Sequence, residues 1–557
     1  MKKNGFTLIE LLGVIIILGL LVVLVFPSII NSIRNSSKKT DDLTLELIYN
    51  AADLYIDNHK NEFYKNNGNQ YSINLKDLVD EGLLVSPIKL SESDEDLTSK
   101  KCIQVTYNDG FDYELKDTET CNVFAINVTL PKGLTPVKYI ENGIWEIADT
   151  NEKWYDYNNQ EWANAVILDE GVSKTPGTKI YPITASGKVQ NIKAMFVYIP
   201  RYSYTIGNTY GVQLAGGSTP SQSTPGGIDI KFVSIGAKEN GEAKYTGSSP
   251  REWYTHPAFT FGDEELEGIW VGKFELSHTT LSASTTGNNL NCSSDSCEGT
   301  IVDNLRILPG VASLRYNNVS NFFYAIKLMS RSGNGFGIKG NTHMIKNSEW
   351  GAVAYLSQSK YGKYGNPNYE GADKEVYQNK SSNYITGSSN GTPSTNTYRD
   401  SSGGQTATEE ITVQCTYMNP TNNCGIGAST TGNITGIYDM SGGSIESVMG
   451  YLTTASENWG ASYGQNSGFA SQPDGKYFNG YTEFGKNDKG HALSEIIIEE
   501  TAWNNDFSAF INDSFPWLRR SGAYFAGPEG GVFSFAYHNG TSFDECSSSR
   551  VVFVQPK

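Results

Sequence analysis

The sequence predicts an α+β protein: a long N-terminal helix with a small β-hairpin domain, followed by a large β-rich domain. Three features indicate this. Residues 6–26 form an apolar run with one charged residue, and residues 102–115 alternate apolar and polar side chains around a turn. The rest of the chain is rich in glycine, serine, asparagine and tyrosine, which favours strands joined by many loops. A chain of 557 residues is too long for a single core.

The apolar run is long enough to cross a membrane. Its 21 residues would form a helix about 31 Å long. Lys2 and Lys3 precede it, so we expect the N-terminus in the cytoplasm and the bulk of the chain outside the cell, in a single-pass membrane protein. Apolar residues then recur at helical spacing, which extends the predicted helix over residues 6–58, with a kink at Pro27. They are Leu43, Leu47, Ile48, Ala51, Leu54 and Tyr55.

The charged residue in this run, Glu10, indicates a function. A lone charge at membrane depth costs about 2.5–3.5 kcal/mol on insertion scales. The stretch Lys3-Asn4-Gly5 followed by Phe-Thr-Leu-Ile-Glu-Leu-Leu resembles the processing signal of type IV pilins and pseudopilins. The resemblance implies that residues 1–5 are a leader, that prepilin peptidase cuts between Gly5 and Phe6, and that Phe6 is then methylated.

The same resemblance implies a role for Glu10 in assembly with other pilin subunits. Its carboxylate would pair with the new amino group of Phe6 on a neighbouring subunit and fix the register between helices. The alternative is a plain membrane anchor whose glutamate reaches the interface.

Residues 59–125 are expected to form the small globular domain of such a subunit. Residues 71–84 predict a short helix that ends near Gly82. Residues 102–115 predict a β-hairpin that turns at Asn108-Asp109-Gly110.

The remaining chain is expected to contain a β-rich connecting region, residues 126–250, and a separate domain, residues 251–557. A hairpin is predicted over residues 153–168, a strand over 193–206 and a helix over 347–359.

Four segments of the last domain resemble, in order, the formylglycine-generating-enzyme branch of the C-type-lectin-like fold. The resemblance implies a lectin-like fold without catalysis, since that chemistry needs two nearby cysteines and residues 510–557 contain only Cys546. No cofactor is expected. Asp439, Ser441 and Glu446 could supply oxygen ligands to a calcium ion, and this alternative stays open because Gly443 replaces the usual asparagine of the family. The four segments are SEWGAVAYLS (348–357), TGIYDMSGGSIESVMG (435–450), WLRRSGAYF (517–525) and SSRVVFV (548–554).

The cysteines favour an oxidising compartment. Six of the seven fall into close pairs, for which we predict three local disulfides, although six cysteines allow fifteen connectivities. The pairs are Cys102 with Cys121, Cys292 with Cys297, and Cys415 with Cys424.

Composition and motifs exclude several function classes. The net charge of −17 argues against general binding to nucleic acid or anionic lipid. The histidines are scattered, and the Gly-x-Ser-x-Gly match at residues 460–464 lies in a Gly/Asn/Ser-rich stretch without the strand–turn–helix context of a nucleophile elbow. We therefore expect no enzymatic activity.

A ligand-binding face is predicted near the C-terminus, where aromatic residues alternate with small polar ones. Phe533 and Phe535 are expected in the core. The exposed binding set is expected to be Tyr524, Tyr537, His538 and Asn539.

These features together predict a minor type IV pilin-like subunit that presents a lectin-like adhesion domain to an unknown extracellular ligand, at the pilus tip or cell surface. The alternatives are a pseudopilin of a secretion or DNA-uptake apparatus and a membrane-anchored enzyme relative.

Overall fold

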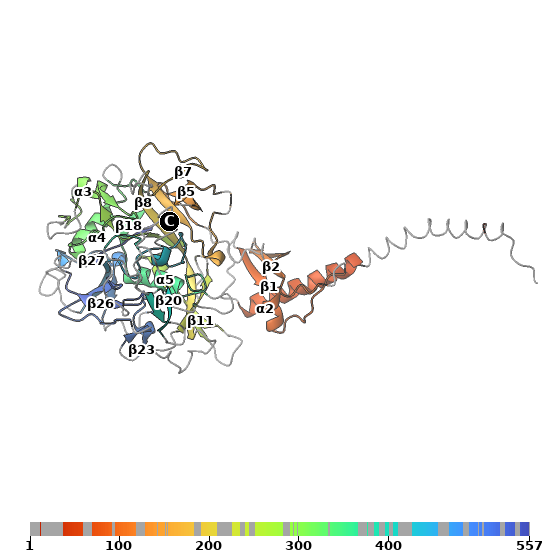
Figure 1. The fold of residues 1–557 in the computed structure, drawn as a ribbon. Coiled ribbons are helices and arrows are strands. Elements are labelled where there is room, and N and C mark those ends of the chain that lie inside the picture. The colour runs from red at the N-terminus through yellow and green to blue at the C-terminus, as the bar shows by residue number, and fades with distance from the viewer. Residues whose placement is uncertain are drawn as a thin grey trace, which may run out of the picture. The chain divides into compact units, whose positions relative to one another are not determined.

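The computed structural model divides into two units, an N-terminal unit (residues 1–125) and a C-terminal unit (residues 126–557), which we describe separately (Figure 1). The described residues are 12, 37–59, 70–91, 95–107, 109–117, 128–141, 143–150, 152, 154–182, 191–208, 226–233, 235, 240–243, 251–281, 290–292, 294–297, 299–331, 335–365, 372, 376, 384–388, 396–399, 405–409, 426–454, 467–482, 489–498, 501–503, 506–523, 530–540 and 546–555.

The N-terminal unit is built from a helix over residues 37–58 and a three-stranded antiparallel sheet, in the order β1-β2-β3. Buried apolar side chains of the helix, such as Ile48 and Ile56, share one core with Ile103 and Val105 of the sheet. The predicted hairpin is confirmed. The helix predicted over residues 71–84 is confirmed only over residues 75–80, because residues 70–74 form a strand that pairs with β2. The elements are β1 (Gln70–Asn74), α2 (Leu75–Asp80), β2 (Lys101–Tyr107) and β3 (Phe111–Asp117).

The apolar run over residues 6–26 lies outside the described residues, apart from Leu12. Within the described part of the chain, no helix is both long and apolar enough to cross a membrane.

The C-terminal unit contains an antiparallel sheet with eight described strands, in the order β18-β28-β15-β8-β6-β4-β5-β7. The three strands from residues 268–554 form one side of this sheet and the five from residues 135–200 form the other, and the two groups meet where β15 pairs with β8. The expected separation of a connecting region, 126–250, from a domain, 251–557, is therefore wrong, because both halves contribute to one sheet. The strands are β4 (Thr135–Glu141), β5 (Ile144–Ile147), β6 (Asn164–Leu168), β7 (Lys179–Ile180), β8 (Ile192–Pro200), β15 (Gly268–Gly272), β18 (Asn341–Met344) and β28 (Val551–Val554).

Among the described residues, this unit also contains two larger sheets and four two-stranded ones. The chain leaves β8 at Pro200 and enters another sheet at Tyr202, so the single strand predicted over 193–206 is two strands. One sheet has the order β10-β9-β12-β11, and the other has the order β22-β21-β25-β26 with β27 also paired to β21. The strands are β9 (Tyr202–Asn208), β10 (Gly226–Phe232), β11 (Asn240–Ala243), β12 (Arg251–Thr255), β21 (Ile445–Leu452), β22 (Asn479–Tyr481), β25 (Trp517–Arg520), β26 (Phe535–His538) and β27 (Ser547–Ser548).

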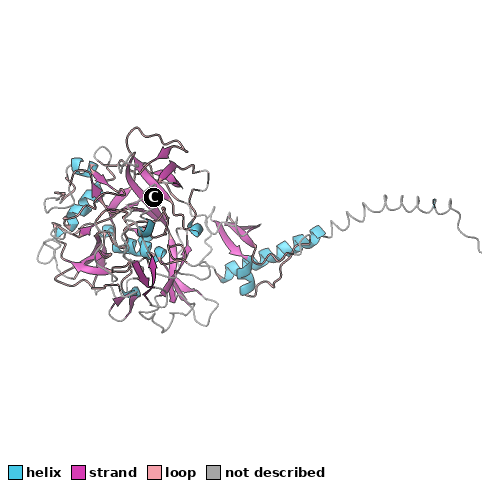
Figure 2. Ribbon diagram, viewed as in Figure 1, coloured by secondary structure: helices cyan, strands magenta, loops and turns pink. Residues whose placement is uncertain are grey.

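Strands outnumber helices in the C-terminal unit (Figure 2). The predicted helix over 347–359 is present as α5, and every one of its residues is buried. Such a helix is surrounded by core on all sides, which removes the one-sided apolar stripe of a surface helix. The remaining elements are α3 (Gly299–Asp303), α4 (Val319–Leu328), α5 (Asn347–Ser357), β13 (Thr260–Phe261), β14 (Glu264–Glu265), β16 (Ser277–His278), β17 (Leu305–Arg306), β19 (Asn396–Arg399), β20 (Gln405–Glu409), β23 (Ile497–Ile498) and β24 (Thr501–Ala502).

A buried ion pair joins two of these sheets. The guanidinium of Arg550, beside β28, donates from Nε to both carboxylate oxygens of Glu446 on β21, at 3.1 and 3.0 Å. It also donates to the carbonyl of Gly272 at 2.8 Å and to that of Tyr438 at 2.9 Å. Arg550 and Glu446 are both fully buried, so the pair connects β15, β21 and β28 inside the core.

Two more buried carboxylates lie near this pair. Glu275 accepts a hydrogen bond from the N–H of Ser444 at 2.8 Å, and its other oxygen accepts one from the Ser313 hydroxyl. Asp439 accepts the N–H of Gly387 at 3.0 and 2.8 Å. Burial and the neighbouring Glu446 raise the pKa of Asp439 to about 7, against the opposing effects of the Gly387 N–H and Arg550.

We predict that Arg550→Met lowers the free energy of unfolding of the C-terminal unit by about 3–5 kcal/mol, because it leaves the Glu446 carboxylate buried without its partner. Adding Glu446→Gln should recover part of this loss. All nine tryptophans lie in residues 126–557, so tryptophan fluorescence during urea unfolding follows this unit alone. The control is Arg331→Met, at an exposed arginine, for which a change within about 0.5 kcal/mol is expected. Equal losses in both variants would contradict the prediction.

A second prediction concerns pH. In the folded protein Asp439 keeps its proton up to about pH 7, against an ordinary pKa of 3.8, so folding binds protons in this range. The contribution of Asp439 to stability is therefore present at low pH and is lost as the pH rises from about 4 to about 7. Asp439→Asn removes this loss, and the difference in unfolding free energy, variant minus wild type, should increase from pH 4 to pH 8. Exposed Asp513→Asn is the control, and a pH-independent difference for Asp439→Asn would refute the prediction.

Candidate functional site

A pocket of about 410 Å³ in the C-terminal unit is the candidate site. Two segments distant in sequence form it, residues 137–162 and residues 426–435. Five aromatic rings contribute to its lining, together with the carboxylates of Asp156 and Glu161. The rings belong to Tyr139, Trp145, Trp154, Tyr155 and Trp162.

The β4–β5 hairpin and the turn that follows it place these rings. Tyr139 and Trp145 face each other across the hairpin, with ring centroids 5.6 Å apart. After the hairpin, Asp156 caps the 3-10 helix η1 (Tyr157–Asn159) by accepting the N–H groups of Asn158 and Asn159. The backbones of Asp156 and Glu161 then pair at 2.7 and 2.8 Å. This closed turn holds Trp154 and Tyr155 on one side and Trp162 on the other.

The second wall is tied to this turn by side-chain hydrogen bonds. Asn433 Nδ2 donates to the carbonyl of Gln160 at 2.9 Å, and Asn433 Oδ1 accepts the N–H of Thr435 at 2.9 Å. The hydroxyl oxygen of Thr435 accepts the N–H of Trp162 at 3.0 Å. The polar side chains of the wall thus hold the two segments together.

The buried Lys273 fixes the same wall from inside. Its ammonium donates to Asn164 Oδ1 at 2.8 Å and to the carbonyls of Ile434 and Gly436 at 2.7 and 2.9 Å. It also lies 5.2 Å from the centroid of the Trp145 ring. Burial lowers the pKa of Lys273, but three acceptors favour the charged form, because a neutral amine has only two N–H donors.

The three residues considered as calcium ligands, Asp439, Ser441 and Glu446, each form hydrogen bonds within the protein instead. Glu446 pairs with Arg550, Asp439 accepts from Gly387, and the hydroxyl of Ser441 donates to the carbonyl of Gly530 at 3.1 Å. Arg550 already supplies positive charge to these carboxylates, so the arrangement does not fit a calcium ion. In the described part of the chain, no group of three His, Cys, Asp or Glu side chains is placed to hold a metal.

The structure explains why glycine occupies position 443. Gly443 has a φ of +68°, a left-handed conformation, and a Cβ atom there would lie 2.7 Å from Glu275 Oε1. Any larger side chain would therefore displace a buried carboxylate.

The predicted C-terminal binding set is only partly exposed. Phe533 and Phe535 are in the core, as expected, and Tyr537 is 39% exposed. His538 is buried, which corrects its predicted exposure: it lies opposite Trp517 of β25, and its Nδ1 accepts the N–H of Gly540 at 2.8 Å. Asn539 is half-buried. Tyr524 lies outside the described residues, as do the processing and assembly residues Gly5, Phe6 and Glu10.

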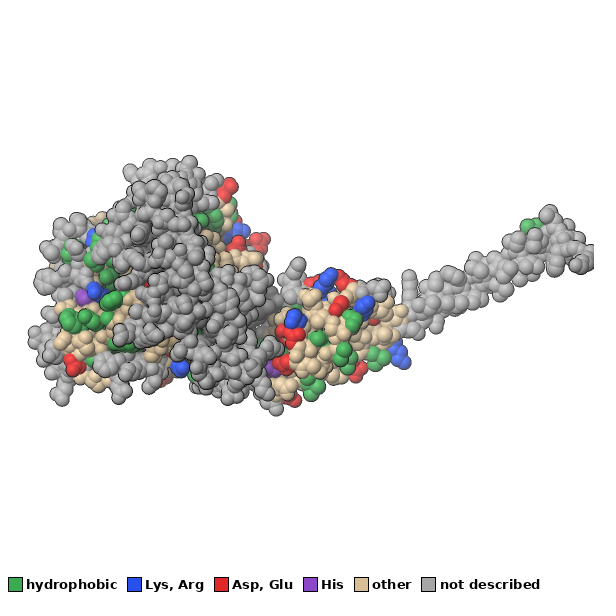
Figure 3. All heavy atoms as spheres, turned by 60° about the horizontal axis from the view of Figure 1, so that its bottom comes forward, with side chains coloured by type: hydrophobic (Ala, Val, Ile, Leu, Met, Phe, Trp, Pro, Cys, Tyr) green, Lys and Arg blue, Asp and Glu red, His purple; other side chains and the backbone are tan. Residues whose placement is uncertain are grey.

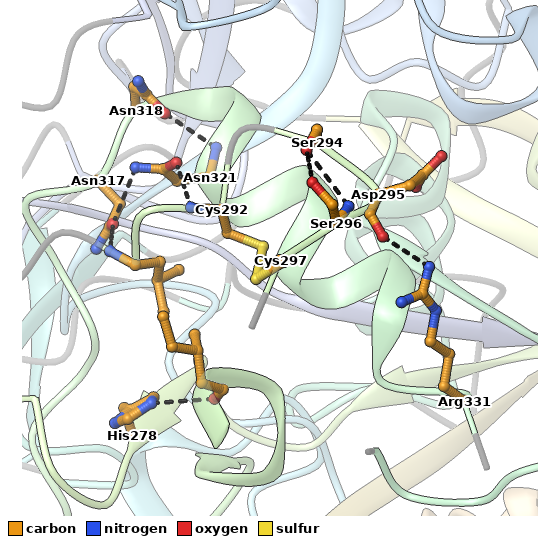
Figure 4. Close-up of a disulfide and its surroundings, with 12 residues drawn as sticks. His278, Cys292, Ser294, Asp295, Ser296, Cys297, Asn317, Asn318, Asn321 and Arg331 are labelled. Carbon is orange, nitrogen blue, oxygen red and sulfur yellow. Dashed lines mark hydrogen bonds between the residues drawn. A yellow bond between two sulfur atoms is a disulfide. The ribbon is translucent and has the colours of Figure 1, made fainter. Parts of the chain in front are cut away.

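One predicted disulfide, Cys292–Cys297, is present and closes a short turn (Figure 4). The N–H of Cys292 donates to Asn321 Oδ1 at 3.0 Å, which attaches the turn to α4. Cys102 is also disulfide-bonded. The pairings with Cys121 and between Cys415 and Cys424 stay predictions, since those three residues lie outside the described part of the chain.

Sequence reasoning missed the pocket although half of it was visible. The stretch KWYDYNNQEW, residues 153–162, is unusually aromatic, but its pattern predicts only part of the hairpin expected over residues 153–168. The structure has a 3-10 helix over residues 157–159 there, closed by the backbone pair of Asp156 and Glu161. Residues 426–435 carry no comparable signal. They meet the turn through contacts between residues more than 270 positions apart, as in the bond from Asn433 to Gln160.

Comparison with known proteins identifies the N-terminus. Residues 1–26 match the family model described as the prokaryotic N-terminal methylation motif. No curated protein matches the chain. The N-terminus is thus that of a type IV pilin-like or pseudopilin-like precursor, a class that prepilin peptidase processes and that assembles with other pilins.

Proposed function

We propose that this protein is a minor type IV pilin-like subunit whose C-terminal unit binds a ligand at the pilus or cell surface. The observation that carries the proposal is the second apolar face of the helix over residues 37–58. Its inner face packs on the sheet of the same unit. Its outer face carries three exposed leucines in a row, separated by four and seven positions: Leu43 at 59%, Leu47 at 61% and Leu54 at 55% exposure.

An apolar row of this kind suits contact between subunits. Hydrophobic side chains lie exposed among charged ones on the face of the N-terminal unit seen in Figure 3. Residues 43, 47 and 54 lie on one side of a helix, so they form a stripe along the axis. The stripe follows the N-terminal methylation motif in sequence, and the helices of neighbouring subunits would cover it.

Contacts among the four lectin-like segments support the proposed fold of the C-terminal unit. The N–H of Met449 on β21 donates to the carbonyl of Ile345 beside α5 at 2.8 Å. Arg520 on β25 donates from Nε to Asn347 of α5 at 2.7 Å. The first segment lies in α5, so these bonds, with the pair between Arg550 and Glu446, connect the start of that helix and Ile345 just before it to the other three segments.

A binding role suits this unit better than catalysis. Catalysis in the family that these segments resemble needs two neighbouring cysteines, and Cys546 is the only cysteine in the sequence of residues 510–557. The aromatic pocket offers a concave surface of a size typical of small-molecule sites. A large unit of this kind is accommodated most easily at a tip or as a rare exposed subunit.

Processing gives the first test of this proposal. Mass analysis of the N-terminus of membrane-extracted protein should find Phe6 as the first residue, carrying a methyl group. The cut before the apolar run leaves the helix on the mature chain, unlike ordinary secretory cleavage. A mature chain that begins after residue 26 would contradict the proposal.

Assembly gives the second test. Leu47→Ser should strongly reduce incorporation into sheared filaments, because it places a hydroxyl in the proposed contact stripe, while folding is retained at this exposed position. Recovery in the filament fraction is compared with that in the membrane fraction by immunoblot. Glu46→Ser, at the neighbouring exposed position, is the control and should leave incorporation unchanged. Normal incorporation of Leu47→Ser would remove the stripe from the assembly contact.

A further inference from the structure

We propose that the aromatic pocket binds a quaternary alkylammonium group. This inference rests on the ligand-binding role proposed above and adds the chemical class of the ligand. It follows from three properties of the pocket: its aromatic rings, its charge, and the hydrogen bonds that its polar side chains already form within the protein.

The aromatic rings supply faces that attract cations. Trp154, Tyr155 and Tyr139 are each partly exposed at the pocket. Trp154 and Tyr155 stand nearly perpendicular, at 89°, with their centroids 5.0 Å apart. Rings set at such an angle can enclose a rounded group rather than a flat one, and tryptophan is the strongest of the aromatic partners for a cation. The chain itself already places the Lys273 ammonium over the ring of Trp145, at 5.2 Å.

The charge of the pocket favours a cation as well. Glu161 is exposed and Asp156 half-buried, and both residues line the pocket, where the Asp156 carboxylate also caps η1. Lys138, which also lines it, is paired with Glu146 at 3.0 Å. The residues that line the pocket thus carry two carboxylates and one ammonium, and that ammonium is already paired, so the charge at the pocket surface is negative. An anionic ligand would be repelled.

Most hydrogen-bond donors and acceptors of the polar side chains of the wall are already used within the protein, so few remain to bind the hydroxyl groups of a sugar. Asn433 and Thr435 both bond to the carbonyl of Gln160 and to each other. The indole N–H of Trp162 donates to the carbonyl of Tyr361 at 3.1 Å. A sugar needs directed donors and acceptors for its hydroxyls. A quaternary ammonium has no N–H group, so rings and carboxylates are sufficient.

Calorimetry with a charged ligand and its neutral isostere tests this inference. The full chain is solubilised in a polyoxyethylene ether detergent, which carries neither choline nor sugar. Choline is titrated against 3,3-dimethylbutanol, which has the same shape without the charge. We expect choline to bind at least about tenfold more tightly, as one favourable cation–π site provides.

Matched variants locate the binding. Glu161→Gln should weaken choline binding about three- to tenfold without changing the affinity for 3,3-dimethylbutanol. Trp154→Ala should weaken choline binding further. Glu170→Gln removes the same charge from an exposed glutamate that does not line the pocket, and it should leave the affinity unchanged. Tryptophan fluorescence during unfolding verifies that each variant is folded.

The remaining outcomes are distinct. Equal affinity for choline and 3,3-dimethylbutanol, no binding of choline, or binding of methyl glucoside in its place would each overturn the inference. If phosphocholine binds as tightly as choline, the ligand is a headgroup that carries the quaternary ammonium. If only choline binds, the ligand is a free quaternary ammonium ion. Both outcomes support the inference. Filament incorporation is measured separately, so a failure here is distinguishable from a failure of the proposed pilin role.

Discussion

The C-terminal unit depends on the burial of one guanidinium. Arg550 reaches Glu446, the carbonyl of Gly272 and the carbonyl of Tyr438, so a single side chain fixes strands of two sheets and the loop between them. Removing this charge from water is costly, and only a full set of acceptors offsets the cost. Two more carboxylates nearby, Glu275 and Asp439, repel Glu446 and so increase the electrostatic cost of burial. Arg550 and the hydrogen bonds that these carboxylates accept offset this cost. The arrangement therefore specifies one geometry rather than many.

The same principle holds the pocket together. Lys273 is buried like Arg550, and its three acceptors come from β6 and from the loop that forms the second wall. A loop-rich chain has little regular backbone pairing to fix such a wall, so a buried cation that binds backbone carbonyls replaces it. The second wall and the ring of Trp145 are therefore fixed by the same buried ammonium.

The two units divide the work of the proposed function. The helix over residues 37–58 buries its inner face on a small sheet, and the leucines of its outer face are exposed. The C-terminal unit has its own core and contributes the pocket. Among the described residues, the two cores share no side chain.

Local features follow from the sequence alone: the processing motif at residues 1–26, the hairpin of β2 and β3, and helix α5. Each depends on residues adjacent in the chain, such as turn formers between alternating strands, whose physics acts without the rest of the protein. Three other features are visible only in the folded chain: strands from residues 126–250 share a sheet with strands beyond residue 251, His538 is buried, and an aromatic turn meets a loop far along the chain. These outcomes depend on which distant segments pack together, and the burial, hydrogen bonding and pKa of a side chain are set by its neighbours in space rather than in sequence.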